Sequence, residues 1–187
     1  MANKVSGFGK WNKEYANVKI GDTIAWVYGS SDSYRIGAKF LKDCKTVEDW
    51  GCGLGHFKRF RKTGYIGLDG SKTPFADKIV DLAKCKRSCE GIFMRHVLEH
   101  NINWKKILEN ALESCSKKMC LIIFTRFSER TKVIADSVVQ DINVPDISFS
   151  KKELDGIITK YGTFSFTEIS TRTQYWYEAV YKIIKNK

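Results

Sequence analysis

The amino-acid sequence predicts an α/β protein in which helices cover a mostly parallel β-sheet. Three observations support this fold class. From Asp43 onward, short apolar runs alternate with helical stretches, the pattern of parallel strands joined by crossover helices. A glycine-rich stretch, "GCGLG" at 51–55, directly follows the first apolar run. The last two apolar runs are separated by only a few polar residues, too few for a crossover helix, so they should pair as an antiparallel hairpin.

The parallel part of the sheet is expected to use up to five strands. They are "TVEDW" (46–50), "GYIGLDG" (64–70, ending at Asp69), the short "DKIVDLA" (77–83), "EGIFMRH" (90–96) and "KKMCLIIFTRF" (117–127). The last of these is the most apolar run in the chain, which suits a central strand buried on both faces. One helix is expected to begin near Gly55, and another over 103–115, where apolar residues recur at helical spacing.

Beyond residue 127 the pattern changes. The stretch 128–140 ("SERTKVIADSVVQ") is expected to be helical, and a second helix over 150–162 starts with a Ser cap and stops at Gly162. The two remaining strands, 163–170 and 175–184, form the predicted hairpin. No large insertion is visible that would cap the open end of the sheet.

Residues 1–44 are predicted to be an N-terminal extension with a helix, followed by the main domain over 45–187, and the two should form a single compact domain. The helix is capped by Ser31 or Asp32 and runs to about Lys42. Two interpretations of the extension remain open. It packs on one face of the sheet, or it is a lid that brings an aromatic side chain over a ligand, the candidates being Trp11, Tyr15, Trp26 and Tyr34.

Composition narrows the function classes. The chain has 187 residues, of which 43% are hydrophobic, and shows neither a signal-like start nor an uncharged run near the roughly 20 residues that cross a bilayer. We therefore expect a soluble, cytoplasmic protein without a membrane partner. The six cysteines lack CxxC pairs and are expected to be reduced thiols. Cys85 and Cys89 resemble half of a zinc site, but no second pair follows, so no metal is expected.

The net charge of +11 invites a nucleic-acid partner, because Lys and Arg neutralise phosphates. The basic residues are, however, spread over the whole chain. The densest cluster, "KRFRK" at 58–62, is interpreted as a solvated helix face with Phe57 and Phe60 turned to the core.

The glycine loop and the acids around it indicate the ligand. Ligands of open α/β sheets bind beyond the carboxyl ends of the strands, so Asp69 is placed to accept hydrogen bonds from ribose hydroxyls. A nicotinamide dinucleotide would need GxGxxG spacing, whereas this loop has GxGxG. Asp49, just ahead of the loop, would repel a pyrophosphate but suits a sulfonium or ammonium group. These charges favour S-adenosylmethionine (SAM).

Four stretches then carry a family resemblance. "VEDWGCGLG", "YIGLDGS", "IVDLA" and "IFMRHVLEH" resemble, in order and spacing, motifs of class I SAM-dependent methyltransferases, methyltransferase type 11-like. The resemblance covers residues 45–125. It implies a three-layer Rossmann-like fold, a mostly parallel seven-stranded sheet ending in an antiparallel hairpin, SAM as cofactor and S-adenosyl-L-homocysteine (SAH) as product.

The resemblance also implies a set of cofactor-binding residues. These are Gly51, Cys52, Gly53 and Gly55 for the methionine part and sugar, Asp49 for the amino group, Asp69 for the ribose, Gly70, Ser71, Asp81 and Leu82 for the adenine, and Arg95 and His96 for the methionyl end. Some of these residues also have plain structural interpretations: a GxGxG turn joins strands and helices, and Asp69 alone could cap a helix. Glu99 and His100 are expected only to brace the next helix.

Transfer of a methyl group to a hydroxyl needs alignment and a base, and His96 is the candidate catalytic base. The fourth strand lacks the Pro-Pro-aromatic signature of base N-methyltransferases and the acid of ribose 2′-O enzymes. The leading hypothesis is therefore methyl transfer to oxygen of a small molecule or sugar. One alternative is an RNA or protein acceptor, suggested by the charge. Another is a SAM- or nucleoside-binding module without catalysis, suggested by the unusual Glu48 and Trp50. The oligomeric state stays open.

Overall fold

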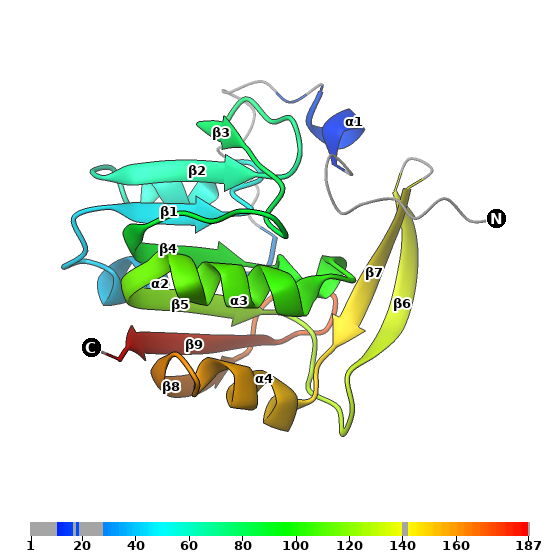
Figure 1. The fold of residues 1–187 in the computed structure, drawn as a ribbon. Helices are drawn as coiled ribbons and strands as arrows, with labels where there is room; N and C mark the ends of the chain where they lie inside the picture. Colours follow the sequence, from blue (N-terminus) through cyan, green and yellow to red (C-terminus); the bar gives the residue numbers. More distant parts are fainter. Residues whose placement is uncertain (1–10, 17, 19–27, 140–141, 187) are drawn as a thin grey trace.

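The computed structural model describes residues 11–16, 18, 28–139 and 142–186, and a seven-stranded sheet forms its centre (Figure 1). The strand order is β3-β2-β1-β4-β5-β9-β8. The bounds are β1 Val47–Trp50, β2 Tyr65–Asp69, β3 Lys78–Ile79, β4 Cys89–Arg95, β5 Cys115–Ile123, β8 Gly162–Ile169 and β9 Glu178–Lys185. The first five in this order are parallel, whereas β9 runs antiparallel to both β5 and β8. The predicted α/β fold class is confirmed, including its terminal hairpin.

Helices cover both faces of the sheet. In Figure 1, α3 (Trp104–Ser114) and α4 (Lys151–Ile158) lie in front of the sheet and α2 (Asp32–Phe40) lies behind it. Successive residues of a strand point to opposite faces, so β4 sends Ile92 and Met94 to the α3 side and Phe93 to the α2 side. This two-sided burial explains the uninterrupted apolar runs 91–94 in β4 and 119–123 in β5.

The helix expected from Gly55 is only a single 3₁₀ turn, η2 (His56–Arg59), so that prediction is wrong. The chain re-enters the sheet through Gly64, at φ 64°, and a Cβ there would lie 2.0 Å from the carbonyl oxygen of Lys45, so this turn requires a glycine. Within the turn Phe57 is fully buried and stacks on Phe93 at 3.7 Å between ring centroids. The neighbouring basic side chains at 58 and 59 are exposed, as the solvated-face interpretation expects.

The helix predicted over 128–140 is wrong for its described residues, 128–139; residue 140 lies outside the described residues. The stretch contributes strand β6 (Lys132–Val139), which pairs antiparallel with β7 (Ile142–Ser148) in a separate two-stranded sheet. The stretch is rich in β-branched residues, and a partner strand decides between two conformations that a single segment leaves open.

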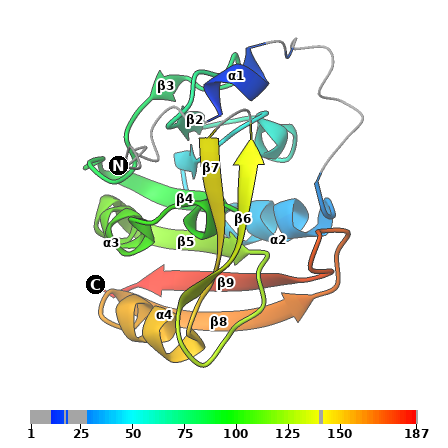
Figure 2. The same cartoon turned by 90° about the vertical axis from the view of Figure 1, so that its right-hand side faces the viewer.

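The β6–β7 hairpin also overturns the expectation that no insertion caps the open end of the sheet. Figure 2 shows it crossing in front of the carboxyl ends of the parallel strands. Side-chain bonds fix its base there: the Thr125 hydroxyl donates to the Ile147 carbonyl at 2.7 Å, and the Ser148 hydroxyl donates to the Arg126 carbonyl at 2.6 Å.

The last strand begins three residues later than predicted. Residues 175–177 belong to a turn instead of β9, which starts at Glu178. Thr173 holds this turn, because its hydroxyl bonds to both the N–H and the carbonyl of Tyr177, and its own carbonyl accepts the N–H of Trp176 at 3.0 Å. The chain is thereby forced to present Trp176 outward.

The buried acid of β1 has a basic partner. Glu48 is 1% exposed, and its carboxylate accepts the Nε–H of Arg87 at 2.6 Å and the indole N–H of Trp50 at 3.0 Å. Both carboxylate oxygens are therefore bonded. Glu48 and Trp50, the two unusual residues beside the glycine loop, thus form a hydrogen bond with each other.

The described residues contain neither a membrane-spanning helix nor a group of metal ligands. No helix among them is long and apolar enough to cross a bilayer, and no three of their His, Cys, Asp or Glu side chains are grouped to hold a metal ion. All six cysteines are buried free thiols.

We predict that Arg87→Ala lowers the free energy of unfolding by about 1 to 3 kcal/mol, because it leaves the Glu48 carboxylate buried without its cation. Urea denaturation would measure the change. Lys86→Ala, which removes an exposed charge beside it, is the matched control and should stay within about 0.5 kcal/mol of wild type. Equal stability of the two variants would contradict this account.

Candidate functional site

The glycine loop lies directly after β1 with all three glycines in the left-handed region, at φ 82° for Gly51, 50° for Gly53 and 69° for Gly55. Packing within the chain explains two of them. A Cβ at Gly51 would lie 2.3 Å from Val97 Cγ2, and one at Gly55 would lie 2.9 Å from Phe75 Cβ. The first and third glycines are therefore required by neighbouring side chains whether or not a ligand binds.

Gly53 faces a different neighbour, the N-terminal helix α1 (Asn12–Tyr15). A Cβ at Gly53 would meet the Tyr15 hydroxyl at 3.1 Å. The backbone N–H of Trp11 donates to the Ser71 hydroxyl at 2.9 Å, which ties the start of α1 to the end of β2. Burial, with the Asp69 carboxylate nearby, raises the pKa of Tyr15 well above its usual value, so the hydroxyl keeps its proton.

Asp69 holds the loop against the end of β2. One carboxylate oxygen accepts the N–H of Gly53 at 2.8 Å and the other accepts the N–H of Ser71 at 2.7 Å. Gly70, between them, is half-buried. Burial raises the pKa of the adjacent Cys52 thiol far above its ordinary value, so this side chain is uncharged.

Asp49 lies beneath the loop in β1 and is 3% exposed. The Tyr65 hydroxyl donates to its carboxylate at 3.1 Å. Burial raises the pKa of Asp49 to about 8, and the nearby Asp69 carboxylate adds to the shift. Two acids thus converge on one loop, and the group that would relieve their repulsion is a cation.

Arg95, at the end of β4, forms its hydrogen bonds with groups of the protein itself. Its Nε and Nη2 atoms lie 2.9 Å and 2.6 Å from one oxygen of Glu178, a side chain with no exposed surface. Nε also lies 3.0 Å from the Ser33 hydroxyl, Nη1 donates to the Tyr34 hydroxyl at 3.0 Å, and Nη2 donates to the Tyr28 carbonyl at 2.6 Å. Arg95 is a hub that joins β4, β9 and the start of α2.

His96 follows Arg95 with a left-handed backbone, φ 57°, which is a strained conformation for a non-glycine residue. Its Nε2 lies 2.7 Å from the same Glu178 oxygen. Burial is the main cause that holds the pKa of His96 well below its usual range, and the charges of Arg95 and His100 act in the same direction. The imidazole is therefore neutral at pH 7.

Aromatic rings gather at the carboxyl ends of β4 and β5. Phe124, the residue after β5, has four ring neighbours within 6.0 Å between centroids: Tyr28, His96, His100 and Tyr175. Trp11 packs edge-on against the His100 ring at 5.7 Å, which brings α1 to the same group. We call these rings the Phe124 cluster.

A buried carboxylate of the β6–β7 hairpin, Asp146, borders the Phe124 cluster. Asp146, in β7 and 3% exposed, accepts hydrogen bonds from the Tyr175 hydroxyl at 2.8 Å and from the Gln174 amide. His100 Nδ1 lies 3.3 Å from its other oxygen and 3.0 Å from the Pro145 carbonyl. His100 therefore braces the hairpin instead of the helix that was expected.

Glu99 braces a strand end. Its carboxylate accepts the backbone N–H of Phe124 at 2.5 Å, and burial raises its pKa to about 8. This contact fixes the point at which β5 ends, beneath the Phe124 cluster.

Two of the predicted residues lie apart from the loop. Asp81 accepts the N–H of Ala83 at 3.0 Å and pairs with Lys84 at 3.5 Å. The Leu82 carbonyl accepts the Asn110 amide of α3 at 3.0 Å. Both follow β3, at the margin of the site.

Comparisons with known proteins identify the fold. No protein-family model and no curated protein matches the chain. Solved structures do: the 1,6-didemethyltoxoflavin-N1-methyltransferase of Burkholderia thailandensis, with SAH bound, matches at TM-score 0.66, 14% identity, 83% of this chain and 77% of that chain. The magnesium protoporphyrin IX methyltransferase of Synechocystis, with SAM bound, matches at 0.58, 14%, 95% and 90%. A SAM-dependent methyltransferase of Listeria monocytogenes matches at 0.58, 12%, 84% and 100%.

The chain has the class I methyltransferase fold. On this fold the loop residues 51–55, Asp69 and Ser71 form one bonded unit, and Arg95 and His96 form a second around Glu178. Sequence reasoning missed Glu178. It lies more than 80 positions after its partners, in an aromatic run that signals only a strand, so no spacing rule could connect them.

The raised pKa of Asp49 predicts a pH dependence of stability. Its usual pKa is 3.8 and its folded pKa is about 8, so the acid favours folding at low pH and this contribution is lost as the pH rises through about 8. Asp49→Asn removes the titrating group. As the pH is raised from about 5 to about 9, the free energy of unfolding of the variant should therefore rise relative to that of wild type by about 1 to 3 kcal/mol.

Urea unfolding of both proteins at the two pH values measures the difference. The similarly shifted Glu99 is present in both proteins and cancels in the comparison. A difference that does not change with pH would show that Asp49 ionises normally.

Proposed function

We propose that this protein is a SAM-dependent methyltransferase with the cofactor held over Gly53. The observation that carries the proposal is the pair of buried acids, Asp49 and Asp69, at a loop whose middle glycine, Gly53, has only Tyr15 of α1 next to it among the described residues. The Asp69 carboxylate would repel a dinucleotide pyrophosphate, whereas a sulfonium with an ammonium group is attracted to it.

The residues present fit this cofactor. Asp69, which holds the N–H of Gly53 at the end of β2, is placed to accept hydrogen bonds from the ribose hydroxyls. Asp49 would lose its proton and pair with the amino group, which lowers its pKa again. Gly70 and Ser71 would border the adenine, with Asp81 and Leu82 at its far edge. Bound there, SAM supplies an electrophilic methyl carbon for transfer.

His96 is proposed as the base. Burial raises the pKa of Glu178, and the Arg95 guanidinium counteracts that shift. With Glu178 ionised beside Arg95, the neutral imidazole would donate its Nε2–H to the carboxylate, which would leave the lone pair on Nδ1. With SAM bound, Nδ1 would take the proton of an acceptor hydroxyl while its oxygen bonds to the methyl carbon and the methyl–sulfur bond breaks to leave SAH, and Glu178 would stabilise the imidazolium that forms. Glu178 is thus a positioning residue for His96.

A small hydroxylated acceptor fits better than RNA or protein. The β6–β7 hairpin crosses the open end of the sheet (Figure 2), and the Phe124 ring packs on His96 at 4.8 Å between centroids, which favours a small acceptor. Two of the structurally similar proteins are named for small acceptors, a toxoflavin precursor and magnesium protoporphyrin IX. The net charge of +11 remains the argument for a nucleic acid.

We further propose that α1 is a lid over the cofactor. Trp11 bonds to Ser71, Asn12 accepts the N–H of Lys72, and Tyr15 covers Gly53. Of the other aromatic candidates for this role, Tyr34 is a core residue stacked on Phe93, and Trp26 lies outside the described residues.

We predict that SAH binds the wild-type protein and that Gly53→Val abolishes binding, because the side chain would enter the ligand space. Asp69→Asn should weaken binding by about 1.5 to 3 kcal/mol through lost charge-assisted hydrogen bonds. Calorimetry measures both. Asp43→Asn, a surface acid paired with Lys118, is the control and should bind normally. Unchanged affinity of Gly53→Val would contradict the cofactor site.

We predict that His96→Gln slows methyl transfer about 10² to 10⁴-fold while SAH affinity changes little. Release of SAH from SAM, with a panel of phenols and sugars as acceptors, is the assay. Glu178→Gln should lower kcat more than it raises KM and should shift the pH profile, which a merely structural role would not do. If the protein binds SAH but forms no SAH from SAM with any of the acceptors, the non-catalytic module is favoured instead.

A further inference from the structure

An open cleft of about 420 Å³ lies beside the turn that joins β8 to β9. It is separate from the glycine loop and the Phe124 cluster. Its lining residues are Gly29, Ser30, Ser170, Thr171, Arg172 and Trp176. None of the steps proposed above uses them.

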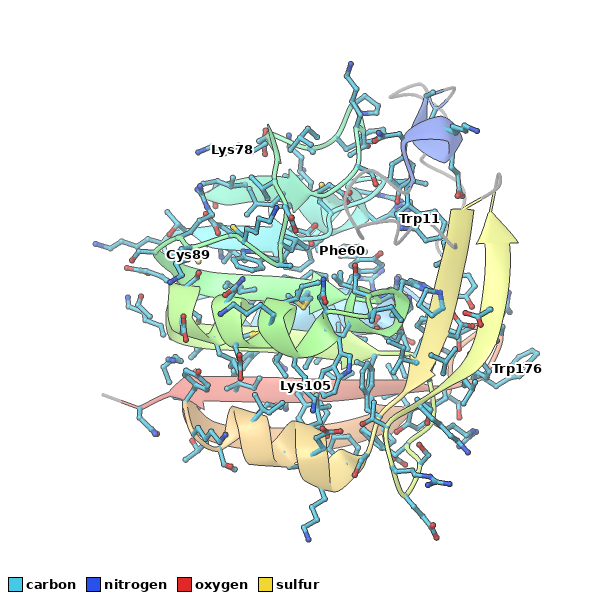
Figure 3. All side chains as sticks on the ribbon, turned by 45° about the vertical axis from the view of Figure 1, so that its right-hand side comes forward. Trp11, Phe60, Lys78, Cys89, Lys105 and Trp176 are labelled. Carbon is cyan, nitrogen blue, oxygen red and sulfur yellow. The ribbon has the colours of Figure 1, made fainter. Side chains whose placement is uncertain are left out.

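Trp176 gives the cleft an aromatic wall. The side chain is 68% exposed, and its backbone is left-handed at φ 51°. Such a conformation is strained for a non-glycine residue, and the surrounding turn holds it through the hydrogen bonds of Thr173. Figure 3 shows Trp176 projecting away from the body of the protein. A large apolar ring is thus kept in water by a strained and rigid support.

Thr171 gives the cleft an unsatisfied polar group. The residue is 5% exposed, and within the described part of the chain its hydroxyl oxygen has no hydrogen-bond partner. Beside it lies Gly29, at φ 84°, where a Cβ would come within 3.6 Å of that hydroxyl and 3.0 Å of Arg95 Nη2. A buried hydroxyl without a partner costs stability, which a bound ligand that bonds to it would restore.

The charges at the rim decide which ligand chemistry fits. Arg172 supplies donors, and Asp32 supplies a carboxylate that already accepts the Ser30 hydroxyl at 2.8 Å. A phosphate group would approach Arg172 but be repelled by Asp32. A neutral ring that carries several hydroxyls can use donors and acceptors together, and its C–H face can pack on an indole.

We infer that the cleft binds a sugar ring, stacked on Trp176 and hydrogen-bonded to Thr171 and the rim residues. The cleft adjoins the proposed catalytic region through the chain neighbours of two of its lining residues. Tyr28, next to Gly29, packs its ring against His96 at 5.7 Å, and Tyr175, next to Trp176, packs against Phe124 at 5.7 Å.

This arrangement makes the cleft the outer subsite for a sugar-bearing acceptor. That role rests on the proposed function, whereas the binding of the sugar does not.

The test is ligand-observed NMR with methyl pyranosides of glucose, galactose, mannose and fucose, without SAM. Saturation transfer to at least one pyranoside is expected, with at least tenfold weaker binding to Trp176→Ala. Ile102→Ala, which removes an equally exposed apolar side chain elsewhere, is the control and should bind like wild type. Adenosine monophosphate provides a nucleotide arm. Binding of the nucleotide alone, or of none of these probes, would overturn the inference.

Thr171→Val separates binding from folding. Valine keeps the shape and removes the unpartnered hydroxyl, so the variant should melt at the same or a higher temperature and yet bind the pyranoside several-fold more weakly. Unchanged pyranoside affinity would remove Thr171 from the site. Calorimetry with SAH tests the methyltransferase proposal independently, so a failure of either can be assigned.

Discussion

The buried ion pair between Arg95 and Glu178 is the contact on which the candidate site depends. It joins β4 to β9 and, through the remaining donors of the guanidinium, to α2 and the residues before it. Removing either partner would leave a desolvated charge, which typically costs about 3 to 5 kcal/mol. The pair also fixes one oxygen of Glu178 beside His96, so a structural contact and the proposed orientation of the base are the same interaction.

The acids at the site contrast with the basic charge of the whole molecule. The chain carries +11, yet Asp49, Asp69, Glu99 and Glu178 are all buried near the carboxyl ends of the parallel strands. Burial raises the pKa values of Glu178, Asp49 and Glu99, the last two to about 8, and Glu178 has a guanidinium partner that opposes the shift. A cation bound beside Asp49 and Asp69 would favour the ionised form of Asp49, so these acids select for positive charge at short range, whatever field the distant surface lysines produce.

The sequence was sufficient where a feature is local. Strands β1, β2, β4 and β5, helix α3 and the terminal hairpin follow from hydrophobic periodicity and connection length. The β6–β7 hairpin could not be predicted in this way, because the segment 132–139 forms a strand only by pairing with the segment 142–148. Glu178, the acid beside His96, was missed for the same reason. The sequence predicted that the glycine loop and Asp69 lie together, as they do. Pairs of side chains from distant segments, such as His96 and Glu178, follow from no local pattern.

The three glycines of the loop do not carry equal weight. Gly51 and Gly55 are explained by Val97 and Phe75, which would clash with any side chain there, so a glycine-rich turn of this kind needs no ligand to account for it. Gly53 differs, because its neighbour is the hydroxyl of a helix that covers the loop from outside. The cofactor assignment therefore depends on one glycine and two acids and not on the motif as a whole.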